Sequence, residues 1–305
     1  MFKDKISVIM SVKNETKYLK IAIDSILSQT YKNFEFLIIN DFNSKQVKKI
    51  LNFYKNKDKR IKIINNKKNL GLTKSLVKVI KKASGDFIAR IDADDFSARD
   101  RLRTQIEWFR ESNKRVLCGT GYFLINKKNN IKKKNIICGE KNIRKSIIFK
   151  NCFIHSSVMF RHKVYKKVGG YNPNFEYSQD YELWSKIINC GEVDNINKRL
   201  TYLRDHKKTL SNLKKNDQAM YGIIISCNNF YFSKKKKFFK YKKNIVKNME
   251  LIKNILLLQD FFKSILFLNR KKIKKTYSLT LTKMSLRSFL YCIQQPKTFL
   301  YNLLP

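Results

Sequence analysis

With 305 residues, of which 43% are hydrophobic and 13% aromatic, the chain can bury the core of a full α/β domain plus a smaller element, which excludes a disordered protein. Its net charge of +43 favours an anionic partner, either nucleic acid, a membrane surface or a phosphate-bearing substrate. A Lys-, Ile- and Asn-rich composition is equally typical of AT-rich coding, so the charge alone does not choose among these partners.

In the first third of the chain, short apolar runs alternate with helical patterns. Strands are predicted at residues 6–10, 34–39, 61–64 and 87–91, and helices at residues 18–27, around 50–53 and at 72–82. Each strand is apolar on both faces, as in a parallel sheet that helices cover on both sides. The alternation therefore predicts a Rossmann-like half.

The pattern becomes less regular after a helix predicted at residues 101–109. Strand segments are predicted at residues 116–125, 131–137, 156–160 and 200–203, and a helix at residues 180–188. On the last helix, Tyr181 and Trp184 are interpreted as core residues. The chain becomes helical, aromatic and strongly basic from residue 213 onward. We expect an α/β domain at residues 1–212 and a basic amphipathic helical region at residues 213–305.

The six cysteines are widely spaced and form no C-x-x-C pair, which favours a reducing cytoplasm over a zinc site or a disulfide framework. The apolar run at residues 6–10 is too short for the core of a signal peptide. Even residues 251–268 are interrupted by charged and amide side chains, so no membrane span is predicted. We expect a cytoplasmic protein whose contact with a membrane, if made, is peripheral and on the inner face.

Polar residues follow three of the predicted strands, at residues 13–15, 40–41 and 92–95. Ligands of parallel α/β sheets bind outside the carboxyl ends of the strands, so these groups are expected to share one rim. The turn after the first strand contains no glycine, which excludes the glycine-rich loop of dinucleotide enzymes. Other groups must therefore hold the phosphates.

Asp92, Asp94 and Asp95 close an apolar strand, where three carboxylates repel one another unless a cation is present. Mg²⁺ and Mn²⁺ prefer oxygen ligands and commonly bridge one or two carboxylates to substrate phosphates. A metal–diphosphate site is the favoured interpretation. The alternative is helix capping, which accounts for Asp100 before the next helix but not for three acids at a strand end.

Asp41 ends the second predicted strand, on the same rim. Its carboxylate can accept hydrogen bonds from a nucleotide base or a ribose. An ordinary Asx turn is the alternative, because Asp recurs at such positions for backbone reasons. The nearby acidic cluster favours the ligand.

Several motifs follow one another in a fixed order. They occupy residues 7–10 with 14–15, 25–31 (SILSQTY), 69–72, 85–90, 92–95 (DADD) with 100–102, 155–161, 169–171, 179–184 (QDYELW) and 202–206. This order resembles family 2 glycosyltransferases of the GT-A fold, of the type that builds bacterial cell-surface polysaccharides, over about two-thirds of the chain. The resemblance implies a Rossmann-like nucleotide-binding half with a mixed central sheet, followed here by the basic helical extension.

The resemblance also implies roles for individual residues. Asp41 is similar to the carboxylate that reads the base, Asp92 to one that faces the ribose, Asp94 to a ligand of Mn²⁺ or Mg²⁺, and Asp180 to the general base of an inverting transfer. The nucleotide-sugar site is expected to include Ser11, Lys13, Glu15, Asp41, Lys74, Asp92 and Ala93. One base and one metal suffice, because a metal neutralises the leaving diphosphate without a protonating acid.

Two histidines, His155 and His206, each have two possible roles. His206 is either a metal or pyrophosphate contact or a surface histidine in a basic loop, and the resemblance favours the metal site. His155 is assigned to the acceptor region, with a hydrogen-bonded core histidine as the alternative.

The sequence departs from the family pattern at several positions. Ser11 replaces a common proline, Lys13 a usual aromatic, Asn40 a frequent second aspartate, and Gln179 the glutamate that normally precedes the base. A catalytically altered homologue is therefore an alternative, although the metal carboxylates and the proposed base are kept.

Residues 213–305 interleave Lys and Arg with Phe, Tyr, Leu and Ile. They are expected either to lie on an anionic membrane surface, which suits a lipid-linked acceptor, or to cap the domain as packed helices. A metal-dependent nucleic-acid-binding protein or nuclease is the competing class. No nucleic acid is expected as a partner, because the predicted rim carries carboxylates.

The expected function is transfer of a hexosyl or N-acetylhexosaminyl group from a nucleotide-sugar donor. We expect this donor to be a UDP-sugar. The expected acceptor is a hydroxyl of a glycan or lipid-linked glycan, in lipopolysaccharide, capsule or similar biosynthesis.

Overall fold

The computed structural model describes residues 4–14, 17–42, 44–126, 130–133 and 136–205, together with short pieces between residues 213 and 229. Glu15, His206 and most of the basic region at 213–305 lie outside the described residues. The chain divides into two compact units, Met1–Lys215 and Asn216–Pro305. The first unit carries the predicted site residues.

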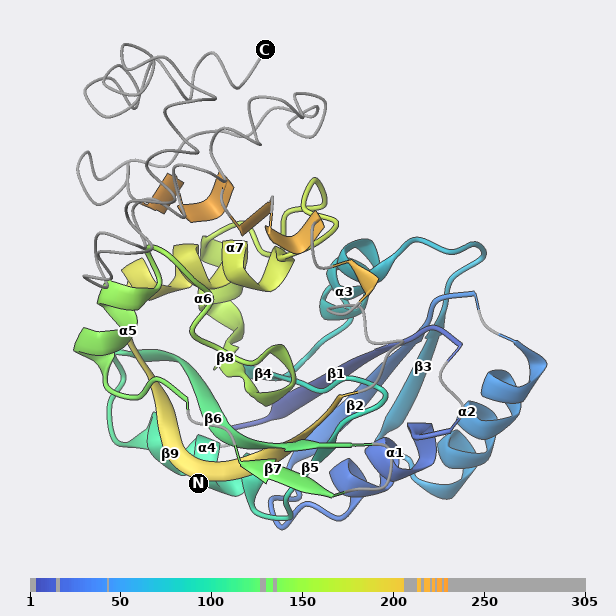
Figure 1. The fold of residues 1–305 in the computed structure, drawn as a ribbon. Helices are drawn as coiled ribbons and strands as arrows, with labels where there is room; N and C mark the ends of the chain where they lie inside the picture. The colour runs from blue at the N-terminus through green and yellow to red at the C-terminus, as the bar shows by residue number, and fades with distance from the viewer. Residues whose placement is uncertain are drawn as a thin grey trace, which may run out of the picture. The chain divides into compact units, whose positions relative to one another are not determined.

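Four parallel strands form one half of the sheet, as predicted. They are β1 (Ile6–Val12), β2 (Phe34–Asn40), β3 (Ile61–Asn65) and β4 (Phe87–Arg90), in the order β3-β2-β1-β4. They alternate with α1 (Leu19–Leu27), α2 (Lys45–Lys57) and α3 (Leu72–Ile80). This alternation is visible in Figure 1 and confirms the Rossmann-like half.

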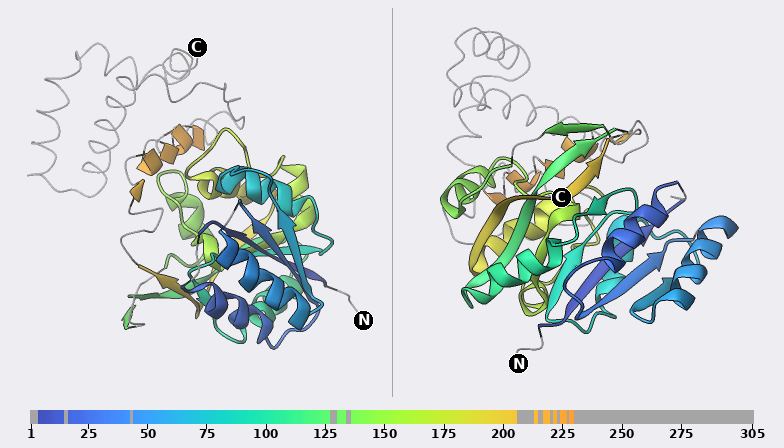
Figure 2. Two further views of the ribbon diagram at one scale, coloured as in Figure 1. Left: turned by 90° about the vertical axis from the view of Figure 1, so that its right-hand side faces the viewer. Right: turned by 90° about the horizontal axis from the view of Figure 1, so that it is seen from below.

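The order of the strands decides which face each helix covers. The connections through α1 and α2 step along the sheet in one direction, whereas α3 leads back past β1 to β4. Since such crossovers are right-handed, α3 covers the face opposite to α1 and α2 (Figure 2). The alternate residues Ile6, Val8 and Met10 of β1 accordingly pack in one core with α1 and α2.

The second half of the sheet is antiparallel where it joins β4. It contains β5 (Phe96–Ser97), β6 (Arg115–Ile125), β7 (Ile131–Lys133), β8 (Met159–Arg161) and β9 (Glu192–Arg204), and β8 pairs antiparallel with β4. Helices α4 (Arg101–Arg110), α5 (Glu140–Ser146), α6 (His162–Lys167) and α7 (Gln179–Ile187) flank these strands in sequence. The sheet is therefore mixed, as expected.

Three predicted strands differ from those observed, and the one predicted at residues 131–137 is observed only at Ile131–Lys133 within the described residues. The strand predicted at residues 156–160 begins as a 3-10 turn, His155–Ser157, and only Met159–Arg161 pairs with its neighbours. The Ser157 hydroxyl donates to the Ile154 carbonyl at 2.8 Å, which stabilises the turn instead of an extended chain. The strand predicted at 200–203 is the end of the much longer β9, whose polar start carries no apolar signal.

The interpretation of Asp100 as a residue whose side chain caps the next helix, α4, is wrong. Asp100 occupies the N-cap position, but its side chain makes no capping hydrogen bond and accepts one from the Thr30 hydroxyl at 2.8 Å. The side chain of Gln29 instead accepts a hydrogen bond from the backbone N–H of Leu102 at 2.9 Å. A side chain from another part of the chain thus satisfies this helix terminus.

No helix within the described part of the chain combines the length and apolar character that crossing a membrane requires. The four cysteines in that part, Cys118, Cys138, Cys152 and Cys190, are free thiols.

Glu35 is a buried carboxylate within β2, and only 3% of its side chain is exposed. Lys62 pairs with it at 2.8 Å, and the hydroxyls of Ser7 and Ser84 and the Ser84 N–H donate to it at 2.7 to 2.8 Å. Burial alone would raise the pKa of Glu35, but these partners lower it to about 2. The charged form therefore stabilises the junction between β2, β1 and the start of β4.

We expect Glu35→Gln to lower the free energy of unfolding by about 2 kcal/mol at pH 7, because hydrogen bonds to a buried charge are lost. The folded pKa lies below the ordinary value of 4.5, so this contribution is present above pH 4.5 and disappears as the pH falls toward 2. Urea unfolding at pH 7 and pH 3 measures both effects. The control is Glu111→Gln, since Glu111 is 64% exposed in its pair with Arg115 and should change stability little. Equal effects of the two substitutions would contradict the prediction.

Candidate active site

The carboxyl ends of β1, β2 and β4 meet at one edge of the sheet. Val12 of β1 lies opposite Asn40 of β2, and the Asp41 N–H donates to the Val12 carbonyl at 3.0 Å. On the other side of β1, the Ile91 N–H donates to the Ile9 carbonyl at 3.2 Å, so Asp92 emerges at the same edge. Pairing of the strands thus brings the predicted rim together.

Asp41 is almost fully buried, and its carboxylate is bound by the loop that precedes α3. Oδ1 accepts hydrogen bonds from Asn66 Nδ2 and the Leu70 N–H, both at 2.8 Å, and Oδ2 accepts one from the Gly71 N–H at 3.0 Å. These partners are distant in sequence, unlike those of an Asx turn. Asp41 therefore fixes the loop that leads to Lys74, and its contact with a nucleotide base stays a prediction.

Asp92 is held by one charged and one neutral partner. The guanidinium of Arg90, a fully buried residue, forms an ion pair with Asp92 Oδ1. The hydroxyl of Ser156 donates to Asp92 Oδ2 at 2.9 Å and accepts the Asp92 N–H at 2.8 Å. Burial would raise the pKa of Asp92, but the charge of Arg90 and the hydrogen bond from Ser156 keep it below the usual value. Asp92 is therefore an oriented carboxylate.

Asp95 has the opposite environment. It is 2% exposed, and its Oδ1 accepts the Arg204 N–H at 2.8 Å. Burial, together with the charges of Asp94 and Asp92, raises the pKa of Asp95 well above its ordinary value. The pKa values of two carboxylates in one motif are thus shifted in opposite directions, as expected where three acids of one motif repel one another.

The carboxylates suit a hard divalent cation that is held jointly with a substrate. No group of three or more His, Cys, Asp or Glu side chains within the described ranges is arranged to hold a metal. Mg²⁺ commonly takes only one or two carboxylates and completes its shell with water and substrate phosphates. The oxygen donors at Asp92 and Asp94, and the charge repulsion that raises the pKa of Asp95, fit this mode of binding.

Asp180 lies in the first turn of α7 and belongs to the same electrostatic cluster. Asn151 Nδ2 donates to Asp180 Oδ2 at 2.7 Å. Burial raises the pKa of Asp180, and the charge of Asp92 adds to this, whereas Asn151 and backbone N–H groups of α7 oppose it. The structure thus brings the predicted base toward the predicted ribose carboxylate.

His155 interacts electrostatically with Asp92. Its Nε2 is 2.8 Å from the Tyr171 hydroxyl, and its ring packs edge-on against Trp184 at 6.2 Å. Burial and the charge of Arg90 lower the pKa of His155 to about 3, so the imidazole is neutral at pH 7. Trp184 is fully buried, as predicted. A role of His155 toward an acceptor stays a prediction.

The other predicted nucleotide-site residues differ in how far they are exposed. Lys13 and Lys74 are exposed, Ser11 is half-buried at the end of β1, and Ala93 is packed in the core. The residue before Lys74, Thr73, donates from its hydroxyl to the Phe175 carbonyl at 2.7 Å. This bond ties the start of α3 to the loop that precedes Asp180. Glu15 and His206 lie outside the described residues.

Sequence reasoning missed three partners of the site, namely Arg90, Ser156 and Asn151. Arg90 was detectable as a lone charge inside an apolar strand. Ser156 and Asn151 were not, because they lie in irregular segments and their partners are remote in sequence.

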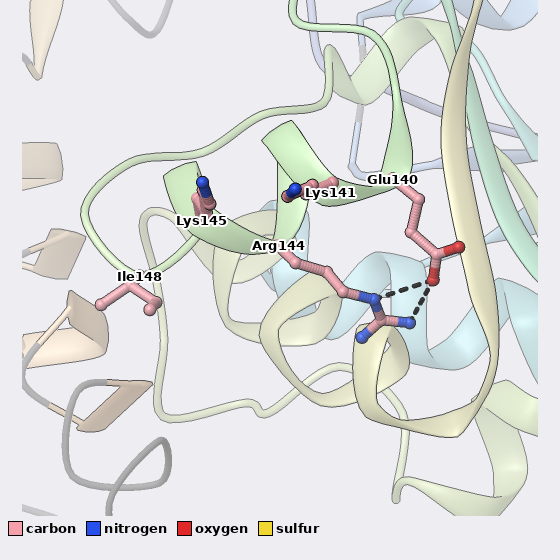
Figure 3. Close-up of a pocket in the computed structure, with 5 residues that line it drawn as sticks. All are labelled: Glu140, Lys141, Arg144, Lys145 and Ile148. Atoms are coloured by element: carbon pink, nitrogen blue, oxygen red, sulfur yellow. Dashed lines mark hydrogen bonds and ion pairs between the residues drawn. The ribbon is translucent and has the colours of Figure 1, made fainter.

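A surface hollow on α5 contains none of the predicted site residues. It is lined by Glu140, Lys141, Arg144, Lys145 and Ile148 (Figure 3). Within it, Arg144 Nε donates to Glu140 Oε1 at 2.8 Å, an ordinary i,i+4 pair on a helix.

The model of glycosyl transferase family 2 matches residues 7–169 of the chain. The O-antigen biosynthesis glycosyltransferase WbnJ of Escherichia coli is 38% identical over 211 residues, which is 68% of this chain and 82% of WbnJ. An uncharacterized glycosyltransferase of Methanocaldococcus jannaschii is 34% identical over 249 residues, which is 77% of this chain and 86% of that protein.

Among solved structures, the chain is similar to S. aureus TarS. The 1–349 structure of TarS in complex with UDP-GlcNAc has a TM-score of 0.61 at 16% identity, covering 90% of this chain and 89% of that chain. The chain spans 54% of the longer TarS structure. At this identity the likeness concerns the fold, and it confirms the predicted GT-A architecture.

We expect Ser156→Ala to weaken binding of UDP in the presence of Mg²⁺ by about tenfold, because Asp92 loses a hydrogen bond to its charged form. Isothermal titration calorimetry measures the affinity. Ser157→Ala is the matched control, since Ser157 is also fully buried but donates to the Ile154 carbonyl and not to Asp92. A loss of affinity shared by both variants would show that the effect comes from packing alone.

Proposed function

The chain belongs to glycosyl transferase family 2, and we propose that it is an inverting enzyme that moves a sugar from a UDP-sugar to a hydroxyl of a glycan or lipid-linked glycan. The observation that carries this proposal is that Asp92, after β4, and Asp180, on α7, are both half-buried and interact electrostatically with each other. A carboxylate for the donor and a carboxylate for the acceptor are what an inverting transfer requires.

We assign the proton transfer to Asp180. The acceptor oxygen bonds to the anomeric carbon while its proton passes to the Asp180 carboxylate. The bond between the anomeric carbon and the diphosphate oxygen breaks, and the nucleoside diphosphate leaves with the electron pair. Attack from the face opposite the leaving group inverts the anomeric configuration. Because burial raises the pKa of Asp180, its carboxylate is a stronger base than an exposed aspartate.

Donor binding is proposed to rest on Asp92 and Asp94, with Lys13 and Lys74 as exposed cations for the phosphates. Asp94 and His206 are the proposed protein ligands of Mn²⁺ or Mg²⁺, which, when bound, neutralises charge on the leaving diphosphate. The Arg90 and Ser156 contacts keep Asp92 ionised and oriented toward this site.

The similarity to WbnJ, an O-antigen biosynthesis glycosyltransferase, supports a role in cell-surface polysaccharide synthesis. The similarity to TarS, solved with UDP-GlcNAc, supports a UDP-sugar donor and a hexosyl or N-acetylhexosaminyl group. A cytoplasmic location suits a nucleotide-sugar donor and the free thiols of the described cysteines. Residues 213–305 are proposed to contact the anionic inner face of the membrane, on the grounds of their basic and aromatic sequence.

A donor-hydrolysis screen across nucleotide sugars, with and without Mn²⁺, tests the proposal. We expect the wild type to release nucleoside diphosphate from a UDP-sugar only with the metal. Asp180→Asn should retain donor binding and lower transfer to a glycan acceptor at least about 10²-fold, whereas Asp94→Ala should weaken metal-dependent donor binding. Equal release of nucleoside diphosphate by the wild type and both variants would refute the mechanism.

The pH dependence of kcat provides an independent test. The base acts when deprotonated, so kcat should fall on the acid side through an apparent pKa above the value of 3.8 usual for aspartate. Because Asn151 stabilises the charged form, Asn151→Ala should move this acid limb to higher pH. Asn52→Ala, which removes an exposed amide on α2, should leave it in place. An acid limb unmoved by Asn151→Ala would contradict the assignment.

A further inference from the structure

Phe42 is an exposed aromatic residue directly after Asp41, at the rim where β2 ends. Its relative exposure is 62%, although phenylalanine is among the residues most often buried. Its φ of 59° lies in the left-handed region, which a bulky side chain seldom adopts. Phe42 thus combines an exposed ring with a strained backbone.

Three non-glycine residues in the described part of the chain have positive φ, namely Asn14, Phe42 and Ser178. Each lies beside a predicted site residue: Asn14 follows Lys13, Phe42 follows Asp41, and Ser178 is two residues before Asp180. Backbone strain that persists in a fold is concentrated at functional sites. Asn tolerates this conformation through its short polar side chain, whereas Phe has no such compensation.

The register of the sheet places Phe42 beside the end of β1. Val12 lies opposite Asn40, and the Asp41 N–H donates to the Val12 carbonyl, so the chain after β2 starts next to residues 13–14. Lys13 is exposed there. Phe42 therefore supplies an exposed aromatic ring at this part of the rim.

We propose that Phe42 is the stacking platform for the nucleobase of the donor. This inference rests on the proposed function and adds a residue that determines how the nucleoside diphosphate is held. An aromatic ring stacks on any base through its π-face, so Phe42 supplies affinity while polar groups choose the base. Burying the exposed ring against the base also removes apolar surface from water.

The exposure of the Phe42 side chain is not by itself the reason to assign it to the nucleobase, because Phe53 is almost equally exposed. Phe53 is 60% exposed, but it lies within the regular helix α2 and packs edge-on against Tyr54 with ring centroids 5.4 Å apart. A single exposed apolar residue on a helix is ordinary. Phe53 is therefore the matched control for Phe42.

The test is isothermal titration of the full chain with UDP and, separately, with inorganic pyrophosphate, both with Mg²⁺. Phe42→Gly removes the ring and also suits the positive φ, so the variant should fold with an unchanged or higher Tm. We expect its Kd for UDP to rise about tenfold while its Kd for pyrophosphate, which has no base, stays the same. Phe42→Trp should keep UDP affinity, and Phe53→Ala should change neither ligand.

If the wild type binds UDP and Phe42→Gly binds it equally tightly, Phe42 is not the stacking platform, and the proposed function is unaffected. An equal loss for UDP and pyrophosphate also overturns the platform, because the ring would then act on the loop and not on the base. A wild type that binds no UDP overturns both the proposed donor and the platform.

Discussion

Two buried arginines fix the end of β4, where three carboxylates follow one another. Arg90 forms an ion pair with Asp92, and Arg101, also fully buried, donates to the Arg90 carbonyl at 2.7 Å and to the Val158 carbonyl at 3.2 Å. Leaving a buried charge without a partner costs several kcal/mol, on the order of 3–5 when one partner is removed. The carboxylates at the rim therefore have a defined geometry before any ligand arrives.

The same contacts link the nucleotide half to the rest of the domain. Gln105 of α4 hydrogen-bonds to Arg101 and, at 2.9 Å, to the Ser157 carbonyl, so the turn that carries Ser156 is held against β4. His155, the first residue of this turn, contacts Tyr171 and Trp184, which belong to the packing around α7. The position of Asp180 thus depends on a series of buried polar and aromatic contacts that begins at β4.

Much of the fold was predictable from the sequence, because apolar runs and helical periodicity report burial directly. The parallel strands and their helices were found in this way, and so was the position of the acidic motif at a strand end. Polar segments carry no such signal. The start of β9 and the turn at His155–Ser157 were missed, since β9 is held by pairing with β6 and the turn by local hydrogen bonds of its serines.

The sequence by itself determined which residue types the rim holds and, through the order of family motifs, which family the chain belongs to. Only the tertiary structure decided how those residues behave. Ser156 approaches Asp92, and Asn151 approaches Asp180, through space and from distant segments. A pKa depends on burial and on the distance to other charges, so neighbouring Asp92 and Asp95 are shifted in opposite directions although the sequence makes them alike.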